Sequence, residues 1–72
     1  METASLTYGS VEYYAEIIRE NSETVGHTYI STSGLVRAVL AGVVSSEAER
    51  LEHIRNVLVA ADRVRAEMQA SR

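Results

Sequence analysis

The stretch YISTSGLVRAVLAGVV, residues 29–44, is the most apolar part of this 72-residue chain and decides the prediction of its fold. It opens with three hydroxyl residues and carries Arg37 as its one charge. From Leu35 to Val44 apolar residues cover much of a helical circumference, which is typical of a helix buried on several sides. A helix is favoured over a strand because alanine and leucine interleave with the valines and the run is long for a strand. We expect residues 27–30 to be a connector. The N-cap of the helix is then expected to be Ser31 or one of its hydroxyl neighbours, Thr32 and Ser33.

Upstream of this stretch the pattern predicts a strand and a helix. Residues 3–8 alternate hydroxyl and apolar side chains, which indicates a short strand with one apolar face. Ser10 is a suitable N-cap for the next helix. Apolar residues then recur at helical spacing, and Gly26 is a candidate stop. The residues of this spacing are Val11, Tyr14, Ile17 and Ile18.

Downstream, Ser46 and Glu49 have the spacing of a capping box, and a third helix is predicted to run to about Ala70. Its apolar stripe is Leu51, Ile54, Leu58, Ala61, Val64 and Met68. Two interpretations of the stripe stay open, namely packing on the first two helices and contact with a partner or second copy. The candidate partner-binding residues are Leu51, Ile54, Leu58, Ala61 and Met68.

Composition limits the classes of protein that this chain can belong to. The net charge is −3, which disfavours general polyanion binding, and the absence of cysteine excludes disulfides and thiolate metal sites. No apolar run reaches the roughly 20 residues of a membrane span, and no export signal is visible, so we expect a cytoplasmic protein. A chain this small gains stability from oligomerisation, so a homodimer is expected.

Catalytic motifs are missing from the sequence. His27 and His53 stand apart, and no HExxH pair or glycine-rich phosphate loop accompanies them. His53, next to Glu52, is expected to be a solvated helix residue. We therefore predict no enzyme activity, no cofactor and no metal site.

The order of strand, helix, polar connector and then STSGLVRAVLAGVV resembles the ribbon-helix-helix family of DNA-binding proteins. The second helix of that family begins with hydroxyl residues, followed by an aliphatic pair, a basic residue and an Ala/Leu run, and the resemblance covers residues 3–44. It implies a mainly α fold in an intertwined homodimer, with a dimerisation and DNA-binding domain at 1–46. The helix in 47–72 resembles the C-terminal extension of ribbon-helix-helix antitoxins, which binds a toxin. The implied function is that of a small transcriptional regulator or antitoxin.

The resemblance also assigns roles to individual residues. Outward side chains of the paired strands would read the major groove, and the start of the second helix would bind a phosphate. Arg37 would reach the DNA backbone, or pair with Glu12 or Glu16 of a neighbouring helix. The DNA-binding residues that follow are Thr3, Ser5, Thr7, Ser31, Thr32, Ser33 and Arg37.

Two departures from the family pattern keep an alternative open. The strand carries no Arg, Lys, Asn or Gln, although basic residues supply most of the non-specific affinity for DNA, and Gly34 stands where a helix former is usual. The alternative is an acidic helical protein-binding module, such as a phage-type inhibitor or adaptor, that does not contact DNA. A second fold also stays open, a three-helix bundle in which residues 3–8 are a disordered tail, and in that fold the ribbon is absent and the family assignment fails.

Overall fold

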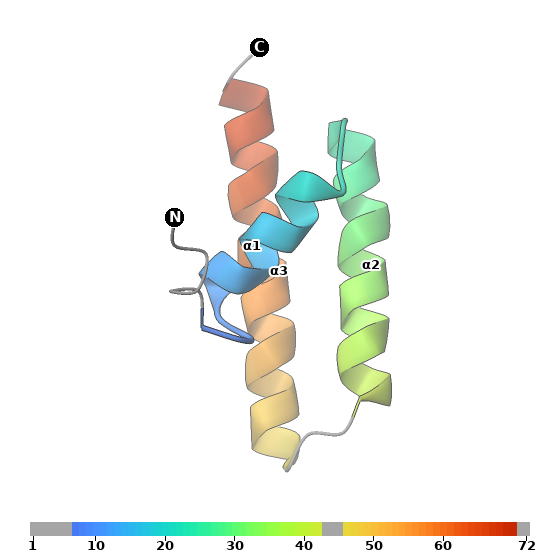
Figure 1. The fold of residues 1–72 in the computed structure, drawn as a ribbon, viewed down its shortest axis with the longest axis vertical. Helices are drawn as coiled ribbons and strands as arrows, with labels where there is room; N and C mark the ends of the chain where they lie inside the picture. The colour runs from blue at the N-terminus through green and yellow to red at the C-terminus, as the bar shows by residue number, and fades with distance from the viewer. Residues whose placement is uncertain (1–6, 43–45, 71–72) are drawn as a thin grey trace.

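The computed structural model describes residues 7–42 and 46–70, and these residues form three helices (Figure 1). They are α1 (Val11–Glu20), α2 (Val25–Ala41) and α3 (Glu47–Ala70). The prediction of a mainly helical chain is confirmed. The described residues contain no strand, and most of the predicted strand, residues 3–6, lies outside them. Thr7 instead leads into a turn, in which its carbonyl accepts a hydrogen bond of 3.0 Å from the Ser10 amide.

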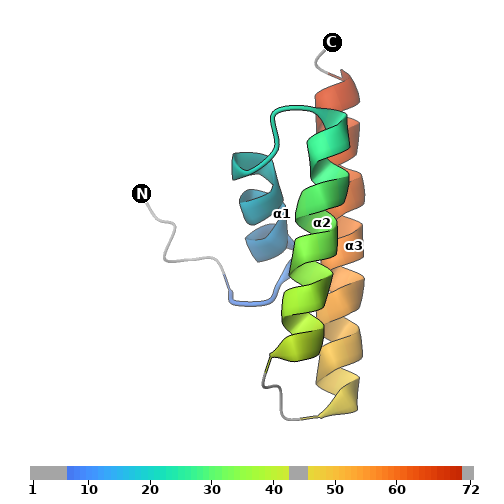
Figure 2. The same ribbon diagram turned by 90° about the vertical axis from the view of Figure 1, so that its right-hand side faces the viewer.

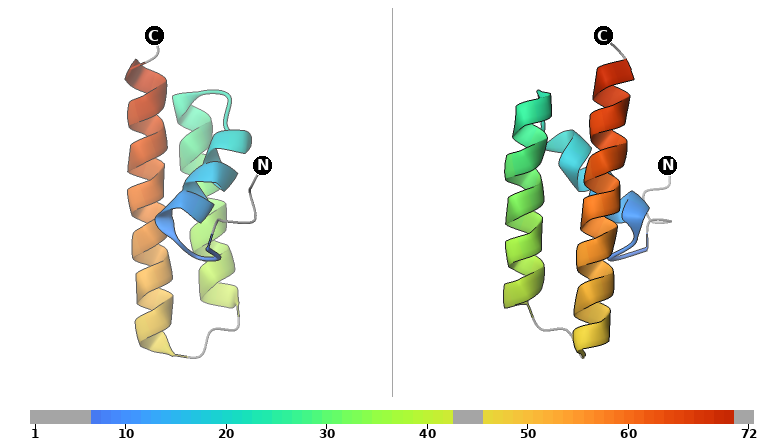
Figure 3. Two further views of the ribbon diagram at one scale, coloured as in Figure 1. Left: turned by 60° about the vertical axis from the view of Figure 1, so that its left-hand side comes forward. Right: turned by 180° about the vertical axis from the view of Figure 1, so that it is seen from behind.

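The helices form a hairpin with one helix laid across it. Helices α2 and α3 run antiparallel side by side, and α1 crosses one face of this pair (Figure 1). The view turned by 90° shows α1 on one side of the hairpin only (Figure 2). From behind, α2 and α3 stand in front of α1, so no described element covers their rear face (Figure 3).

Helix α1 begins where the sequence predicts. The Ser10 hydroxyl accepts a hydrogen bond of 3.1 Å from the Tyr13 amide, which confirms Ser10 as the N-cap. The helix ends earlier than Gly26, at Glu20, where the side chain of Asn21 turns back to donate to the Ile17 carbonyl at 2.7 Å. The Ile17 carbonyl also accepts from the Asn21 backbone amide at 3.1 Å, so Asn21 closes the helix end with two bonds.

Helix α2 begins seven residues earlier than predicted, so the expected connector at 27–30 and N-cap at Ser31 are wrong. The N-cap is Thr24, whose hydroxyl accepts from the His27 amide at 3.2 Å. The His27 ring accepts in turn from the Glu23 amide at 3.2 Å. The ring of His27 therefore resembles the glutamate of a capping box, but the amide that it satisfies is that of Glu23, one residue before the N-cap. Gly26 lies in the first turn of α2 and does not stop a helix.

Helix α3 matches its predicted limits and contributes half of the buried core. The Ser46 hydroxyl accepts from the Glu49 amide at 3.1 Å, and the helix extends to Ala70. All three helices share one core, which holds the buried side chains Tyr14, Ala15, Ile18, Val39, Val57, Ala60, Ala61 and Val64. The alanines of α1 and α3 let these helices approach closely. No helix among the described residues is long and apolar enough to cross a membrane.

Candidate functional site

The hydroxyl residues predicted to meet DNA do not come together at a helix start. Thr3 and Ser5 lie outside the described residues, and Thr7 is exposed ahead of the first turn. Ser31 lies inside α2, where its hydroxyl is 3.2 Å from that of Ser22. A phosphate site on the free amides of a helix start at Ser31 is therefore ruled out.

Its neighbours Thr32 and Ser33 also lie inside α2. The Thr32 hydroxyl donates to the Thr28 carbonyl one turn back at 2.6 Å, and the Thr28 hydroxyl does the same with Val25 at 2.5 Å. Such bonds let a hydroxyl residue occupy a helix interior. Ser33 is exposed.

The predicted partner-binding residues separate into two groups. Leu51 and Leu58 are 67% and 50% exposed, whereas Ala61 is buried in the core. Ile54 and Met68 are half-buried and pack against the core. The residues of α3 that remain available to a partner are therefore those toward its N-terminal half.

The exposed leucines of α3 belong to a stripe on the side away from α1. Helix α1 and the turn before it contact α3 at His53, Asn56, Arg63 and Glu67. At 3.6 residues per turn, the exposed stripe lies roughly 160° around the helix from these positions. The stripe consists of the exposed residues Leu51, Arg55, Leu58 and Asp62, and of Arg65, which is half-buried.

A matching stripe runs along α2. The α1 side of α2 is marked by Ser31, which contacts Ser22, and by Leu35 and Ala38, which line a hollow with residues of α1. Helical spacing again places the exposed stripe roughly 170° away. It consists of Tyr29, Ser33, Arg37 and Leu40.

Together the two stripes form one surface, which we call the open face. At one end the Arg65 guanidinium lies 4.7 Å from the centre of the Tyr29 ring, a cation–π contact between α3 and α2. At the other end Leu40 lines a hollow of about 280 Å³ together with Leu51 and Ile54. Exposed apolar side chains thus extend over both helices along the seam between them, as in protein-interaction sites.

The charged groups on the open face are mainly arginines. Arg37 forms no ion pair with a described residue, so the predicted pairing with Glu12 or Glu16 is wrong. Arg55 is exposed between the leucines of α3. Arg50 lines the hollow beside Leu40, and its buried Nε finds no hydrogen-bond acceptor among the described residues.

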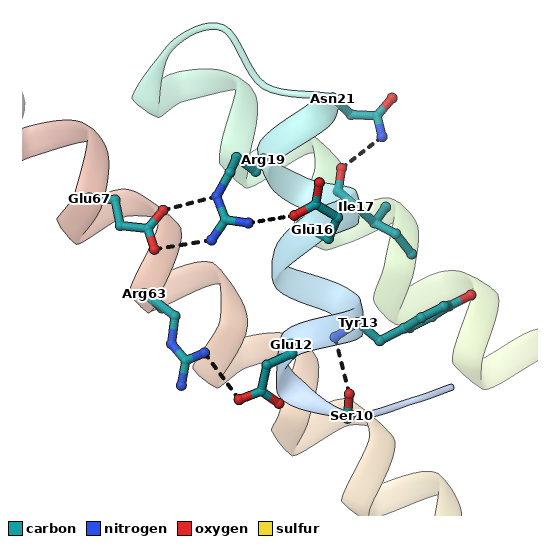
Figure 4. Close-up of polar contacts among 9 residues, drawn as sticks. All are labelled: Ser10, Glu12, Tyr13, Glu16, Ile17, Arg19, Asn21, Arg63 and Glu67. Carbon is teal, nitrogen blue, oxygen red and sulfur yellow. Dashed lines mark hydrogen bonds and ion pairs between the residues drawn. The ribbon is translucent and has the colours of Figure 1, made fainter. Parts of the chain in front are cut away.

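The opposite side of the molecule carries the ion pairs that hold α1 on α3 (Figure 4). Glu12 pairs with Arg63 at 3.5 Å. Arg19 binds both carboxylate oxygens of Glu67 at 3.0 Å and also reaches Glu16 at 2.8 Å. The hydrogen bonds from Arg19 hold the pKa of Glu67 below its usual value, and those same bonds raise the pKa of Arg19.

This lowered pKa predicts a small acid sensitivity. The contribution of Glu67 to stability is present above its pKa in the unfolded chain and is lost as pH falls through the lower pKa of the folded chain. We expect Glu67→Gln to reduce the free energy of unfolding at pH 7, and the difference from wild type to shrink by pH 3. Urea denaturation of both proteins at pH 7 and at pH 3 measures this difference in the free energy of unfolding. Glu20→Gln, at an exposed residue of α1 outside these ion pairs, is the control and should show less change with pH.

A second hollow, of about 790 Å³, lies at the start of α1 and contains the one histidine of α3. His53 is half-buried rather than solvated, and its Nδ1 lies 2.8 Å from the Tyr14 hydroxyl. Burial, with a smaller contribution from Tyr8 and Tyr13, raises the pKa of Tyr14, so its hydroxyl stays protonated at neutral pH. Among the described residues no group of three metal-ligating side chains accompanies this pair. We interpret the contact as one that fixes α1 on α3.

Comparisons with family models, with curated proteins and with solved structures each found no match for this chain. The ribbon-helix-helix resemblance therefore stays a prediction, and functional inference rests on the geometry of the open face.

Sequence reasoning misses the part of the open face on α2. It places Tyr29 in a connector, and it assigns Leu40 to a core because it expects the whole apolar run to be buried. The signal is present in the spacing of Tyr29, Ser33, Arg37 and Leu40, which share one side of a helix only if the helix begins before Tyr29.

Proposed function

We propose that this chain is a helical protein-binding module that holds an amphipathic helix of a partner protein against its open face. The observation that carries the proposal is the alignment of exposed leucines and tyrosine on α2 and α3, on the side that α1 leaves uncovered. This is the second of the two functions expected from the sequence.

A helix is the occupant that suits the shape of the face. Two packed helices lie about 8–10 Å apart and leave a shallow groove along their seam, and an amphipathic helix fills such a groove with residues at positions i, i+3, i+4 and i+7. From Leu51 to Arg65 the α3 stripe extends for about 21 Å at 1.5 Å per residue. A partner helix of about four turns spans this length.

The leucines supply most of the expected binding energy. Burying one leucine side chain contributes about 1.5–3 kcal/mol when it is fully removed from water. Leu40, Leu51 and Leu58 are each half-exposed or more in the free chain, so much of this energy remains available to a partner.

Synthetic amphipathic helices test the proposal directly. Fluorescent 18-residue peptides with a leucine stripe, made with acidic or basic flanking residues, are titrated with the chain and followed by anisotropy. We expect at least one peptide to bind, and Leu51→Gln/Leu58→Gln to weaken its binding about tenfold or more. Val59→Gln is the matched control, because Val59 is 39% exposed on α3 outside the stripe and should leave binding unchanged.

Other results contradict the proposal. Failure of both peptides to bind a folded chain would overturn it, as would equal loss of binding in the Val59 variant. Light scattering provides a further check: a stable dimer that Leu51→Gln/Leu58→Gln converts to a monomer would assign the face to a second copy instead.

DNA binding by a ribbon-helix-helix dimer is the competing prediction. Its strand residues Thr3 and Ser5 lie outside the described part of the chain. A gel shift against the DNA upstream of the chain's own gene, at low and moderate salt, separates the two functions. A specific complex weakened by Thr7→Ala would favour the regulator, and its absence at low salt would favour the binding module.

A further inference from the structure

Charge is distributed unevenly between the two sides of the molecule. Three glutamates form the ion pairs within α1 and between α1 and α3. They are Glu12, Glu16 and Glu67, and all three lie away from the open face. Helix α2 contains no carboxylate at all, and its one arginine, Arg37, lies on the open face. The open face carries Arg37, Arg55 and Arg65 against Asp62, and the hollow at its end is lined by both Arg50 and Glu47, so a chain whose net charge is −3 presents a locally basic surface there.

The arginines of the open face stand on both sides of its leucines. Arg37 precedes Leu40 by three residues on α2, and Arg55 lies between Leu51 and Leu58 on α3. Both guanidinium groups are exposed, and neither forms an ion pair with a described residue. A helix in the seam would therefore pass between two free cations.

We propose that the partner is an acidic amphipathic helix, whose apolar stripe covers the leucines and whose carboxylates flank that stripe to meet Arg37 and Arg55. This proposal rests on the function proposed above and specifies its partner. Arginine suits the role because its planar guanidinium pairs with a carboxylate through two parallel hydrogen bonds. Opposite charges at the rim of an interface select the partner and set its orientation more than they add affinity.

The arginine that already has a carboxylate partner is not part of this recognition. Arg65 pairs with Asp62 on the same helix and stacks on Tyr29. Arg50 lies at the far end of the seam, where its Nε lacks an acceptor among the described residues. An unsatisfied buried donor is costly, and an acid near the end of the partner helix would lower that cost.

Charge also disfavours a second copy as the occupant. A two-fold dimer places the same surface on both sides of the contact. The contact would then gather Arg37 and Arg55 from both copies, whereas the Asp62 carboxylate of each copy already pairs with Arg65. Like charges brought together across an interface oppose association, whereas an acidic helix removes the repulsion.

The test compares three peptides that share one leucine stripe and differ only in flanking residues, which are glutamate, glutamine or lysine. We expect the glutamate peptide to bind about three- to tenfold more tightly than the glutamine peptide, and the lysine peptide to bind most weakly. The preference for glutamate should diminish between about 50 and 500 mM salt, because exposed charges are screened over a shorter distance at high salt.

Two double variants with equal change in net charge locate the effect. Arg37→Gln/Arg55→Gln should abolish the preference for glutamate, while the glutamine peptide still binds. Arg19→Gln/Arg63→Gln removes the same charge from the side that carries α1 and should keep the preference. Circular dichroism confirms that each variant is folded.

The outcomes separate this inference from the function on which it rests. Equal binding of the three peptides by wild type, lost in Leu51→Gln/Leu58→Gln, would overturn the acidic partner and keep the binding module. The acidic partner would also be overturned if Arg19→Gln/Arg63→Gln lost the glutamate preference while Arg37→Gln/Arg55→Gln kept it. Failure of every peptide to bind would overturn both.

Discussion

Replacing Ile18 with alanine is expected to remove about half of the chain's free energy of unfolding at 25 °C. Ile18 lies on α1 with none of its surface exposed, at the centre of a core in which three of the eight buried apolar residues are alanines. Truncation of a buried isoleucine to alanine costs about 2–5 kcal/mol through lost burial and the remaining cavity. A domain of this length has about 4–10 kcal/mol of stability in total, so this one change removes a large share of it. Urea denaturation followed by circular dichroism measures the loss.

Ile30→Ala is the matched control for this change. Ile30 is 72% exposed on α2, so the same substitution there should alter the free energy of unfolding by no more than about 0.5 kcal/mol. A loss at Ile30 as large as that at Ile18 would contradict the proposed core. It would also show that the α2 surface is covered in solution, which bears directly on whether the open face is free to receive a partner.

The starts of α1 and α3 were predictable because local chemistry determines them. Ser10 and Ser46 each precede an apolar periodic segment and each accept the amide three residues on. A serine hydroxyl forms this bond without help from tertiary structure. Local patterns of this kind can be recognised in a single sequence.

The start of α2 was not predictable by the same rule, because two hydroxyl segments compete for the N-cap. Thr24 precedes the glycine at position 26, which disfavours a helix, whereas Ser31 stands directly before the apolar run. The structure selects Thr24 because His27 supplies a second capping bond. In the rejected cap the Thr32 hydroxyl donates to the Thr28 carbonyl one turn back, and the Ser31 hydroxyl lies against that of Ser22. Sequence alone does not reveal these bonds.

The buried side of α3 escapes sequence reasoning for a different reason. The predicted stripe mixes two sides of this helix: Ala61 and Val64 are buried and Ile54 and Met68 pack against the core, whereas Leu51 and Leu58 are exposed. Steps of three and four residues join all six positions, so periodicity does not say which of them face the core. The core is centred instead on Val57, Ala60, Ala61 and Val64, where small residues allow α1 to pack closely. The leucines are consequently left on the open face, and the candidate site becomes visible only when the three helices are placed together.

Replacing Gly9 with alanine is the second change with a large expected effect. Gly9 has φ of +83°, in the region that only glycine adopts freely. A Cβ at this position would lie 2.2 Å from Cε1 of His53, far inside van der Waals contact. The backbone strain costs about 1–2 kcal/mol, and displacing the ring breaks the hydrogen bond to Tyr14, for about 1 kcal/mol more. We expect a loss of about 2–3 kcal/mol in urea denaturation.

Gly34→Ala is the control and should have the opposite sign. Gly34 lies within α2, and no heavy atom lies within 4 Å of the place that a Cβ would occupy. Alanine should therefore stabilise the chain by about 0.5–1 kcal/mol through its higher helix propensity. Two substitutions of identical chemistry thus act in opposite directions because one site is crowded and left-handed and the other is open and helical. Destabilisation by Gly34→Ala would contradict the assignment of this surface as free.

A double-mutant cycle separates the two causes of the loss at Gly9. In a His53→Ala background the clash disappears, and Gly9→Ala should cost only the strain of about 1–2 kcal/mol. The coupling free energy between Gly9→Ala and His53→Ala then measures the contact between Gly9 and His53, which fixes the turn before α1 on α3. An unchanged cost in that background would mean that the strain alone accounts for the effect and that the imidazole moves aside freely. Measurable coupling would instead make the Gly9–His53–Tyr14 contact the anchor that holds α1 on one side of the hairpin and so leaves the other side open.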